Sequence, residues 1–288
     1  MRILFAAVFN PESTNTAQAE ALERLGANVL RYKYRDVAED IGVEGRNKQL
    51  INLCKEEKPD LVLFSKCNGI TAKEVVECNK YSKTCLWYMD PVPHGHWDKE
   101  MFDKIKECTF TCVCKERALK EGRKYTDKIF MVLEGFDQLR DRPFPNITQD
   151  VDVSFIGSSD SYRKDMVDSV GGIIFEGKYG NNHAILVNRT RINLNFCRNG
   201  CVSDRVFKIL AAKGFLLTDD WEGRSEYFDN YKDLVIFEDK MELQKKVDYY
   251  LTHPDEMDEI RAHGYRTVQK FTRDAWAKRI IDLYAECK

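Results

Sequence analysis

One stretch of the sequence places a basic side chain at the start of a helix that leads into a buried strand. In Val202–Asp220, Ser203 and Asp204 are favourable N-cap residues, and apolar residues then recur at helical spacing. Gly214 is expected to take the left-handed conformation that ends this helix. Arg205 lies in the first turn, where the helix dipole and backbone N–H groups also attract anions. The pattern suits a phosphate, although a packed helix with a surface arginine would look the same.

A second candidate is the serine-rich turn in Phe155–Arg163, which follows a strand and enters a helix. Gly157 permits close backbone approach, Ser158 and Ser159 can donate hydrogen bonds, and Arg163 can reach an anion. The segment lacks the full glycine fingerprint of dinucleotide sites and the lysine of a phosphate-binding loop. An ordinary turn therefore stays open as the alternative.

The loop Asp90–Asp98 also follows a strand directly and is stiffened by two prolines. It presents Asp90, His94 and His96, whose side chains could act as a general base or contact a second substrate. Two histidines alone do not make a recognisable metal site, because no third ligand stands at a suitable spacing. A rigid turn without chemistry is the other interpretation.

Acidic residues follow the strand that ends at Thr218. Asp219 is adjacent to the strand end, and Glu226 lies a few residues further on. Glu226 could accept hydrogen bonds from sugar hydroxyls, although an exposed helix carboxylate often has no specific role.

Composition limits the class of protein. The chain has 288 residues and a net charge of -2, so the global charge gives no support for binding nucleic acid or membrane. No apolar run approaches the ~20 residues of a membrane helix, and Met1–Ala7 looks like a strand rather than a signal peptide. Of the ten cysteines, Cys112 and Cys114 should face the same side of one strand, and no second pair stands at zinc-like spacing. We expect a reduced, cytoplasmic protein without structural metal.

Strands and helices alternate along both halves of the chain. Apolar strands between helices predict parallel sheets covered on both faces, so the fold class is α/β with two Rossmann-like domains. In the first half, helices are expected at Lys48–Glu57 and Trp97–Glu107; in the second, no element is expected between Phe175 and Arg191. A proline-containing linker separates the halves. The expected domains are residues 1–140, residues 150–272 and a last helix over residues 273–288.

The second half resembles the CgeB-like glycosyltransferases, which are relatives of the group 1 glycosyltransferases. The resemblance covers roughly residues 151–284, and the first half is similar mainly in layout. It rests on these motifs: Leu194-Asn195, Arg205-Val206-Phe207, the segment from Ala211 to Asp219, and Glu226-Tyr227-Phe228.

The resemblance implies a GT-B fold, with two Rossmann-like domains facing across a cleft and a C-terminal helix, containing Trp276, that crosses back to the first domain. The second domain would hold a nucleotide-diphosphate sugar, with UDP as the expected nucleotide, and no cofactor or metal would be needed. Lys208 stands where the family usually has a glutamate near the donor ribose. The residues implied or considered for donor binding are Gly157, Ser158, Arg163, Ser203, Arg205, Asp219 and Glu226.

The activity implied is transfer of a hexose to an acceptor hydroxyl. An inverting enzyme would need a base, for which Asp90 and His94 are the candidates, whereas a retaining relative would need none. The acceptor remains open among a glycan, a small molecule, a protein and a modified DNA base, and so does the oligomeric state. A sugar-nucleotide epimerase and a silent nucleotide-sugar-binding module are the alternatives.

Overall fold

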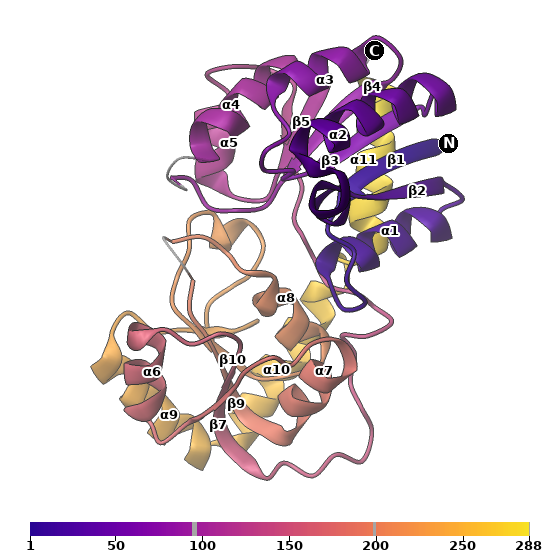
Figure 1. Ribbon diagram of the computed structural model, residues 1–288. Coiled ribbons are helices and arrows are strands. Elements are labelled where there is room, and N and C mark those ends of the chain that lie inside the picture. Colours follow the sequence, from indigo (N-terminus) through magenta and orange to yellow (C-terminus); the bar gives the residue numbers. More distant parts are fainter. Residues whose placement is uncertain (94–96, 198–199, 288) are drawn as a thin grey trace. The chain divides into compact units, whose positions relative to one another are not determined.

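The computed structural model describes residues 1–93, 97–197 and 200–287. It divides into two compact units (Figure 1). The first unit comprises residues 1–134 together with the C-terminal segment from Arg273, and the second comprises residues 135–272. Each unit is an open, parallel α/β structure, as the alternation of strands and helices predicts.

The first unit is built on a parallel sheet with the strand order β2-β1-β3-β4-β5-β6. This order changes direction at β1, so the loops after β1 and β3 diverge at the carboxyl edge, as in other doubly wound sheets. The strands are β1 Arg2–Ala7, β2 Asn28–Lys33, β3 Leu61–Ser65, β4 Lys83–Tyr88, β5 Phe110–Val113 and β6 Ile129–Met131.

Helices cover both faces of this sheet. Their bounds are α1 Thr14–Arg24, α2 Tyr34–Glu57, α3 Ala72–Asn79, α4 Trp97–Glu107, α5 Glu116–Gly122 and α11 Arg273–Glu286. The expectation of a helix only over Lys48–Glu57 was too short, because α2 begins at Tyr34. A kink at Gly42, whose φ is 75°, interrupts the helix, and the residues around it are mostly exposed. That half of α2 therefore lacks the apolar periodicity by which a helix is recognised.

Alternate residues of the strands enter two separate cores. Leu4, Val62 and Leu86 face α2, α3, α4 and α5, whereas Ile3 and Phe5 face α1 and α11. This is the two-sided burial expected for a parallel sheet, in which neither strand face is left polar.

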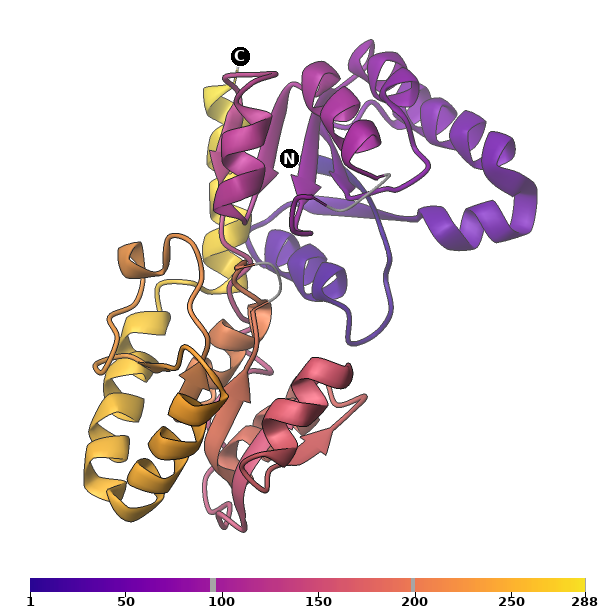
Figure 2. The ribbon, with the colours of Figure 1, turned by 90° about the vertical axis from the view of Figure 1, so that its left-hand side faces the viewer.

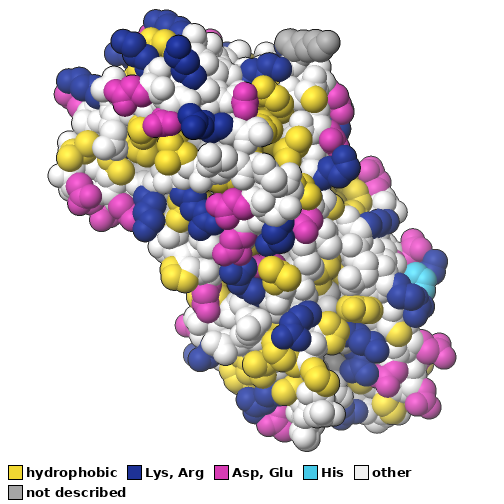
Figure 3. Space-filling model, turned by 90° about the vertical axis from the view of Figure 1, so that its right-hand side faces the viewer, with side chains coloured by type: hydrophobic (Ala, Val, Ile, Leu, Met, Phe, Trp, Pro, Cys, Tyr) yellow, Lys and Arg dark blue, Asp and Glu magenta, His cyan; other side chains and the backbone are white. Residues whose placement is uncertain are grey.

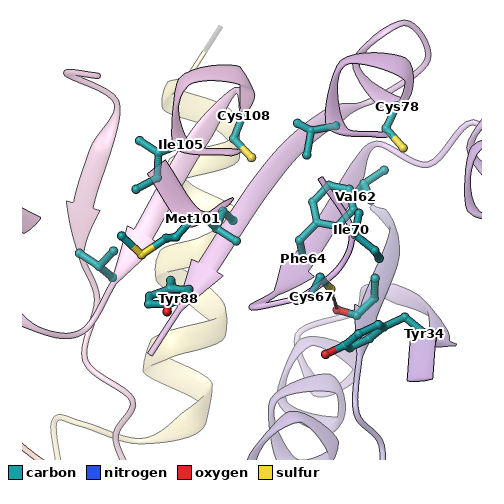
Figure 4. Packing of buried hydrophobic residues seen from close by; sticks show 14 of the residues in the cluster. Tyr34, Val62, Phe64, Cys67, Ile70, Cys78, Tyr88, Met101, Ile105 and Cys108 are labelled. Atoms are coloured by element: carbon teal, nitrogen blue, oxygen red, sulfur yellow. Dashed lines mark hydrogen bonds between the residues drawn. The ribbon is translucent and has the colours of Figure 1, made fainter. Parts of the chain in front are cut away.

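Cysteines take part in these cores as small apolar side chains. Figure 4 shows Cys67, Cys78 and Cys108 among the aliphatic and aromatic residues of the first core. Burial raises the pKa of the Cys67 and Cys108 thiols to about 12. Cys112 and Cys114 both lie in the second core, on the same face of the sheet as predicted. All ten cysteines are free thiols.

The C-terminal helix α11 returns to the first unit, where it lies along the sheet (Figure 2, yellow). The ring of Trp276 meets that of Trp87 edge-on, with centroids 5.6 Å apart, and both rings are buried. Arg24 of α1 forms an ion pair with Asp274 at 2.6 Å. The predicted crossing of the last helix back to the first domain is therefore present.

The second unit has a parallel sheet with the strand order β11-β10-β9-β7-β8. Its strands are β7 Val151–Ile156, β8 Ile173–Phe175, β9 Thr190–Asn195, β10 Leu216–Thr218 and β11 Val235–Ile236. Its helices are α6 Ser161–Asp168, α7 Gly180–Arg189, α8 Asp204–Ala211, α9 Lys240–Thr252 and α10 Pro254–Val268, with a short 3-10 turn, η1, at Arg224–Glu226.

Helix α7 is the element that the sequence did not predict. It begins with Gly180, and its N-cap residue Tyr179 makes no side-chain capping bond. Glycine and asparagines at a helix start carry a weak helical signal, so the buried residues Ala184 and Val187 are what hold α7 on the sheet. Helices α6 and α9 pack on one face of the sheet, and α7 and α8 lie on the other (Figure 1).

The Trp276 contact provides a test of how α11 stabilises the first unit. Trp276→Ala removes a fully packed ring and should destabilise this unit by about 3–5 kcal/mol. Urea unfolding followed by circular dichroism measures the loss. Lys278→Ala on the exposed side of the same helix is the matched control, with an expected change within about 0.5 kcal/mol. If Trp276→Ala destabilised the protein no more than the control does, the packing of α11 would not depend on the tryptophan contact.

Candidate functional site

The loops after β7, β9 and β10 meet at one edge of the second sheet. Phe155 of β7 pairs with Leu194 of β9, and Leu194 pairs with Leu217 of β10, so the three strands end side by side. Ligands of open parallel sheets bind at this carboxyl edge. The chain segments that reach it carry most of the predicted donor-binding residues of the second unit.

Asn195, the last residue of β9, joins several of these residues. Its Oδ1 accepts hydrogen bonds from Ser203 Oγ at 2.8 Å and from Arg205 Nη1 at 2.9 Å. Its Nδ2 donates to Thr218 Oγ1 at 2.9 Å. Arg205 Nε also donates to the carbonyl oxygen of Ile156 at 2.7 Å. The start of α8 is thereby bound to the ends of β7, β9 and β10.

Ser203 occupies the N-cap position of α8, as expected, but its hydroxyl does not cap the helix. The side chain turns to Asn195 instead. The predicted residue type is therefore in place with a different hydrogen bond, and the positive end of the α8 dipole is not covered by the Ser203 side chain.

Gly157 lies directly against Arg205. Its φ of 155° favours glycine, and a Cβ there would lie 2.4 Å from Arg205 Nη2. The guanidinium also stands 4.6 Å from the centre of the Phe155 ring, and that of Arg163 is 5.3 Å from the same ring. The absence of a side chain at Gly157 is what lets Arg205 reach the end of β7.

Arg163 is buried, and its guanidinium donates to the carbonyl oxygens of Ser158 at 2.9 Å and Phe196 at 3.3 Å. These contacts hold the glycine–serine loop in place. Ser158 is exposed, and its N–H and hydroxyl make no hydrogen bond within residues 1–93, 97–197 and 200–287. Two donors of this loop therefore face outward beside Arg205.

Asp219 follows β10 and accepts a hydrogen bond from the backbone N–H of Cys197 at 2.6 Å. Burial raises the pKa of the Asp219 carboxyl above its ordinary value. Tyr162 lies close by: burial, followed by the charge of Asp219, raises the pKa of its phenol. Its ring is 55% exposed and meets Phe196 edge-on. Sequence reasoning missed Tyr162 because a tyrosine in a helix carries no local signal of a site.

Glu226 is the predicted site residue that this network does not include. It is exposed in the turn η1, and no hydrogen bond or ion pair joins it to the residues around Asn195 in the described part of the chain. Its proposed contact with a sugar hydroxyl stays a prediction.

Beneath the start of α8 lies a buried histidine of α7. Burial, and then the charges of Lys208 and Arg205, lower the pKa of His183 to about 3, so the imidazole is neutral at pH 7. Its Nδ1 has no hydrogen-bond partner within the described residues. Lys208 pairs with Asp204 at 2.6 Å, one helical turn away. Lys208 is thus paired with an acidic residue of the same helix.

The end of α8 corrects one expectation. Lys213, not Gly214, takes the left-handed conformation, with a φ of 61°. Its N–H donates to Leu210 O, and that of Gly214 donates to Ile209 O, which is the pattern of a Schellman motif. Gly214 is required for space instead, because a Cβ there would lie 2.5 Å from Val187 Cγ1.

In the first unit, Asp90 lies two residues beyond β4 and forms an ion pair with Lys66 at 2.5 Å. Lys66 and Cys67 both have left-handed backbones, with φ values of 57° and 51°, so the loop after β3 is tightly turned toward Asp90. His94 and His96 lie outside the described residues. The structure thus locates one of the two candidate bases.

Two further observations concern metal ligands and membrane helices. No group of three or more His, Cys, Asp or Glu residues in the described ranges could hold a metal ion. Within those ranges, no helix is long and apolar enough to cross a membrane. On the face shown in Figure 3, basic and acidic side chains are interspersed, in keeping with the net charge of -2.

Comparison with known proteins assigns the class. A family model described as glycosyl transferase-like matches residues 138–282, half of the chain, and the chain belongs to this family. No curated protein matches the chain by sequence.

Solved structures show the fold. A glycosyltransferase from Rickettsia africae ESF-5 has a TM-score of 0.71 at 13% identity, with 99% of this chain and 98% of that chain covered. HepE of Anabaena, solved with UDP-glucose, has a TM-score of 0.75 at 9% identity, with coverages of 99% and 100%. TarM of S. aureus has a TM-score of 0.61 at 8% identity, with coverages of 83% and 59%. The chain has the GT-B fold of these glycosyltransferases.

The buried histidine leads to a prediction of pH dependence. Between pH 6.5 and pH 3 the unfolded chain protonates His183 but the folded protein does not, so lowering the pH stabilises the unfolded state. At pH 5 this should cost the wild type about 2 kcal/mol relative to pH 7.5. His183→Met should lack this part of the pH dependence, as measured by urea unfolding at both pH values. His253→Gln, at an exposed position, should behave like the wild type. If the stability of His183→Met depended on pH as that of the wild type does, the pKa of His183 would be the same in the folded and the unfolded protein.

Proposed function

We propose that this protein is a glycosyltransferase of the CgeB-like branch that transfers a hexose from a UDP-sugar to an acceptor hydroxyl without a metal ion. The observation that carries the proposal is the cluster in which Arg205, Gly157 and Asn195 join three strand ends at the start of α8. This arrangement presents a guanidinium, a helix N-terminus and a loop without a side chain at one place.

Such an arrangement suits the leaving group of glycosyl transfer. As the bond between sugar and diphosphate breaks, negative charge grows on the diphosphate, and fixed positive groups lower the energy of that state. Arg205 is held by three neutral groups, the Ile156 carbonyl, the Asn195 amide and the Phe155 ring, so its position is set before a ligand binds. The Ser158 N–H and hydroxyl add donors beside it.

Two features support a UDP-sugar as the donor. HepE, which shares the fold over nearly the whole chain, was solved with UDP-glucose. In this protein, the exposed ring of Tyr162 and the carboxyl of Asp219 lie at the same sheet edge as Arg205. We assign Tyr162 to stack on the nucleobase or the sugar, because an exposed aromatic face beside a polar cluster favours such contacts.

On the acceptor side we keep Asp90 as the candidate base of an inverting reaction. Lys66 holds its carboxyl by an ion pair and so orients it after β4. A retaining reaction would not need this base, and the acceptor remains open among a glycan, a small molecule, a protein and a modified DNA base. The ten free thiols fit a reaction in the reducing cytoplasm.

The donor site can be tested by slow hydrolysis of a panel of nucleotide sugars in the presence of EDTA. We expect release of UDP from one UDP-sugar. Arg205→Gln should reduce that rate by about 10²–10³-fold, because it removes the charge that faces the leaving group. Release is measured by anion-exchange chromatography.

Arg189→Gln is the matched control, since Arg189 pairs with Asp150 at the other edge of the same sheet. Its rate should equal that of the wild type. Binding of UDP without turnover of any donor would identify a silent binding module, and conversion of a donor without UDP release would identify an epimerase. Loss of activity with EDTA that Mg²⁺ restores would contradict metal independence.

The role of Asp90 can be separated from donor binding. In an inverting enzyme, Asp90→Asn should lower donor hydrolysis by about 10²-fold or more, because water loses its base, while calorimetric affinity for UDP stays unchanged. Asp103→Asn on the surface of α4 serves as the control. Undiminished hydrolysis by Asp90→Asn would exclude Asp90 as the base and favour a retaining reaction.

A further inference from the structure

The second unit has a pocket of about 330 Å³ at the sheet edge opposite the Arg205 cluster. Gln149 comes just before β7, Asn188 just before β9, and Lys213 just before β10. All three residues line the pocket, so the pocket lies at the amino ends of the same strands whose carboxyl ends meet at Asn195. Because the two sites are separated by the length of the strands, this pocket is not part of the proposed donor site.

The polar lining of the pocket is cationic and amide-rich. Lys213 and Arg261 contribute positive charge, and Asn146, Asn188 and Gln149 contribute carboxamides. No carboxylate belongs to the lining among the described residues. Such a combination favours an anion that also carries hydroxyl groups.

Lys213 lines the pocket from a left-handed position at the end of α8. At the C′ position of α8 it has a φ of 61°, where glycine is the favoured residue. Its ammonium makes no ion pair or hydrogen bond within the described part of the chain. Lys213 therefore has a strained backbone conformation, and its ammonium makes no hydrogen bond or ion pair that a ligand would have to replace.

Arg261 of α10 supplies the second charge. Its Nη2 pairs with Asp258 at 2.6 Å, but its Nε is buried and has no hydrogen-bond partner within the described residues. The Arg261 side chain as a whole is 20% exposed. Arg261 lines the pocket, so its guanidinium brings positive charge to that wall.

The remaining wall includes apolar residues, and two hydrogen bonds hold part of it in place. The Arg142 guanidinium lies over the Phe144 ring, 4.4 Å from its centre. The backbone N–H of Phe144 donates a hydrogen bond to Asn188 Oδ1 at 2.6 Å. Asn188 is in turn fixed to the carbonyl oxygen of Ala212 at 2.6 Å. An aromatic wall beside carboxamides suits a sugar ring, and the volume is at the lower end for small-molecule sites.

We propose that this pocket is a second ligand site, which binds a monosaccharide phosphate with its phosphate toward Lys213 and Arg261. The carboxamides of Asn146 and Gln149 would contact the hydroxyl groups, and Phe144 the ring. The proposal does not depend on the donor site, because no residue of the pocket belongs to the Arg205 cluster.

Calorimetric titration of glucose 6-phosphate, with inorganic phosphate and glucose as the separate parts, tests the site. The wild type and Arg205→Gln should bind glucose 6-phosphate equally. Lys213→Gly should weaken binding by about tenfold or more, because it removes a charge-assisted contact. The same change relieves the left-handed strain and should raise the melting temperature by roughly 2 °C. Weaker binding together with higher stability cannot result from misfolding.

Lys245→Gln is the control, because Lys245 is exposed on α9 and does not line the pocket. It should leave the affinity unchanged, whereas Arg261→Gln should lower it as Lys213→Gly does. No binding of glucose 6-phosphate at millimolar concentration would overturn the proposal. Binding lost in Arg205→Gln but kept in Lys213→Gly would also overturn it, since the ligand would then occupy the donor site. Equal affinity for inorganic phosphate would refute the part played by the sugar.

Discussion

The second unit depends on the hydrogen bonds that Arg205 and Asn195 make with each other and with the neighbouring strand ends. They connect the first turn of α8 to the ends of β7 and β9, and Asn195 extends the connection to Thr218 of β10. Asn195 is fully buried, so these bonds lie in surroundings where leaving a polar group unpaired is costly. The same contacts that stabilise the sheet edge therefore also hold the charge that the proposed reaction uses.

The lack of a side chain at Gly157 is the second requirement of this edge. The space that a Cβ would fill is occupied by Arg205 Nη2, and the guanidinium rests on the Phe155 ring of the same strand. Arg163 rests on that ring as well and binds two backbone carbonyl groups of the adjoining loops. Arg163 thus holds the loop, whereas Arg205 is the residue proposed to face the ligand, a difference that the arginine side chain alone does not reveal.

More of the fold than of the site could be predicted from the sequence. Apolar strands between helices indicate burial directly, so both parallel sheets follow from the pattern, whereas the return of α11 was expected only from the family resemblance. The kinked start of α2 and the poorly capped α7 lack that pattern and were missed. In the site, Arg205 and Gly157 could be predicted because one stands at a helix start and the other directly after a strand. Tyr162 and His183 could not, because their neighbours in the site are distant in the sequence and are brought together by the sheet order. The left-handed end of α8 was assigned to Gly214, because propensity favours glycine, although Lys213 adopts it.

The two ends of α8 differ in what they can offer an anion. At its N-terminus, backbone N–H groups and the dipole add to the charge of Arg205, so side chain and main chain act together. At its C-terminus the dipole is negative and favours the ammonium of Lys213, but the backbone there offers carbonyl oxygens, which repel an anion. Any anion held at that end must depend on side chains alone. Binding of an anion in the pocket would therefore rely on the Lys213 and Arg261 side chains. At the opposite edge of the sheet, backbone N–H groups would share that role with Arg205.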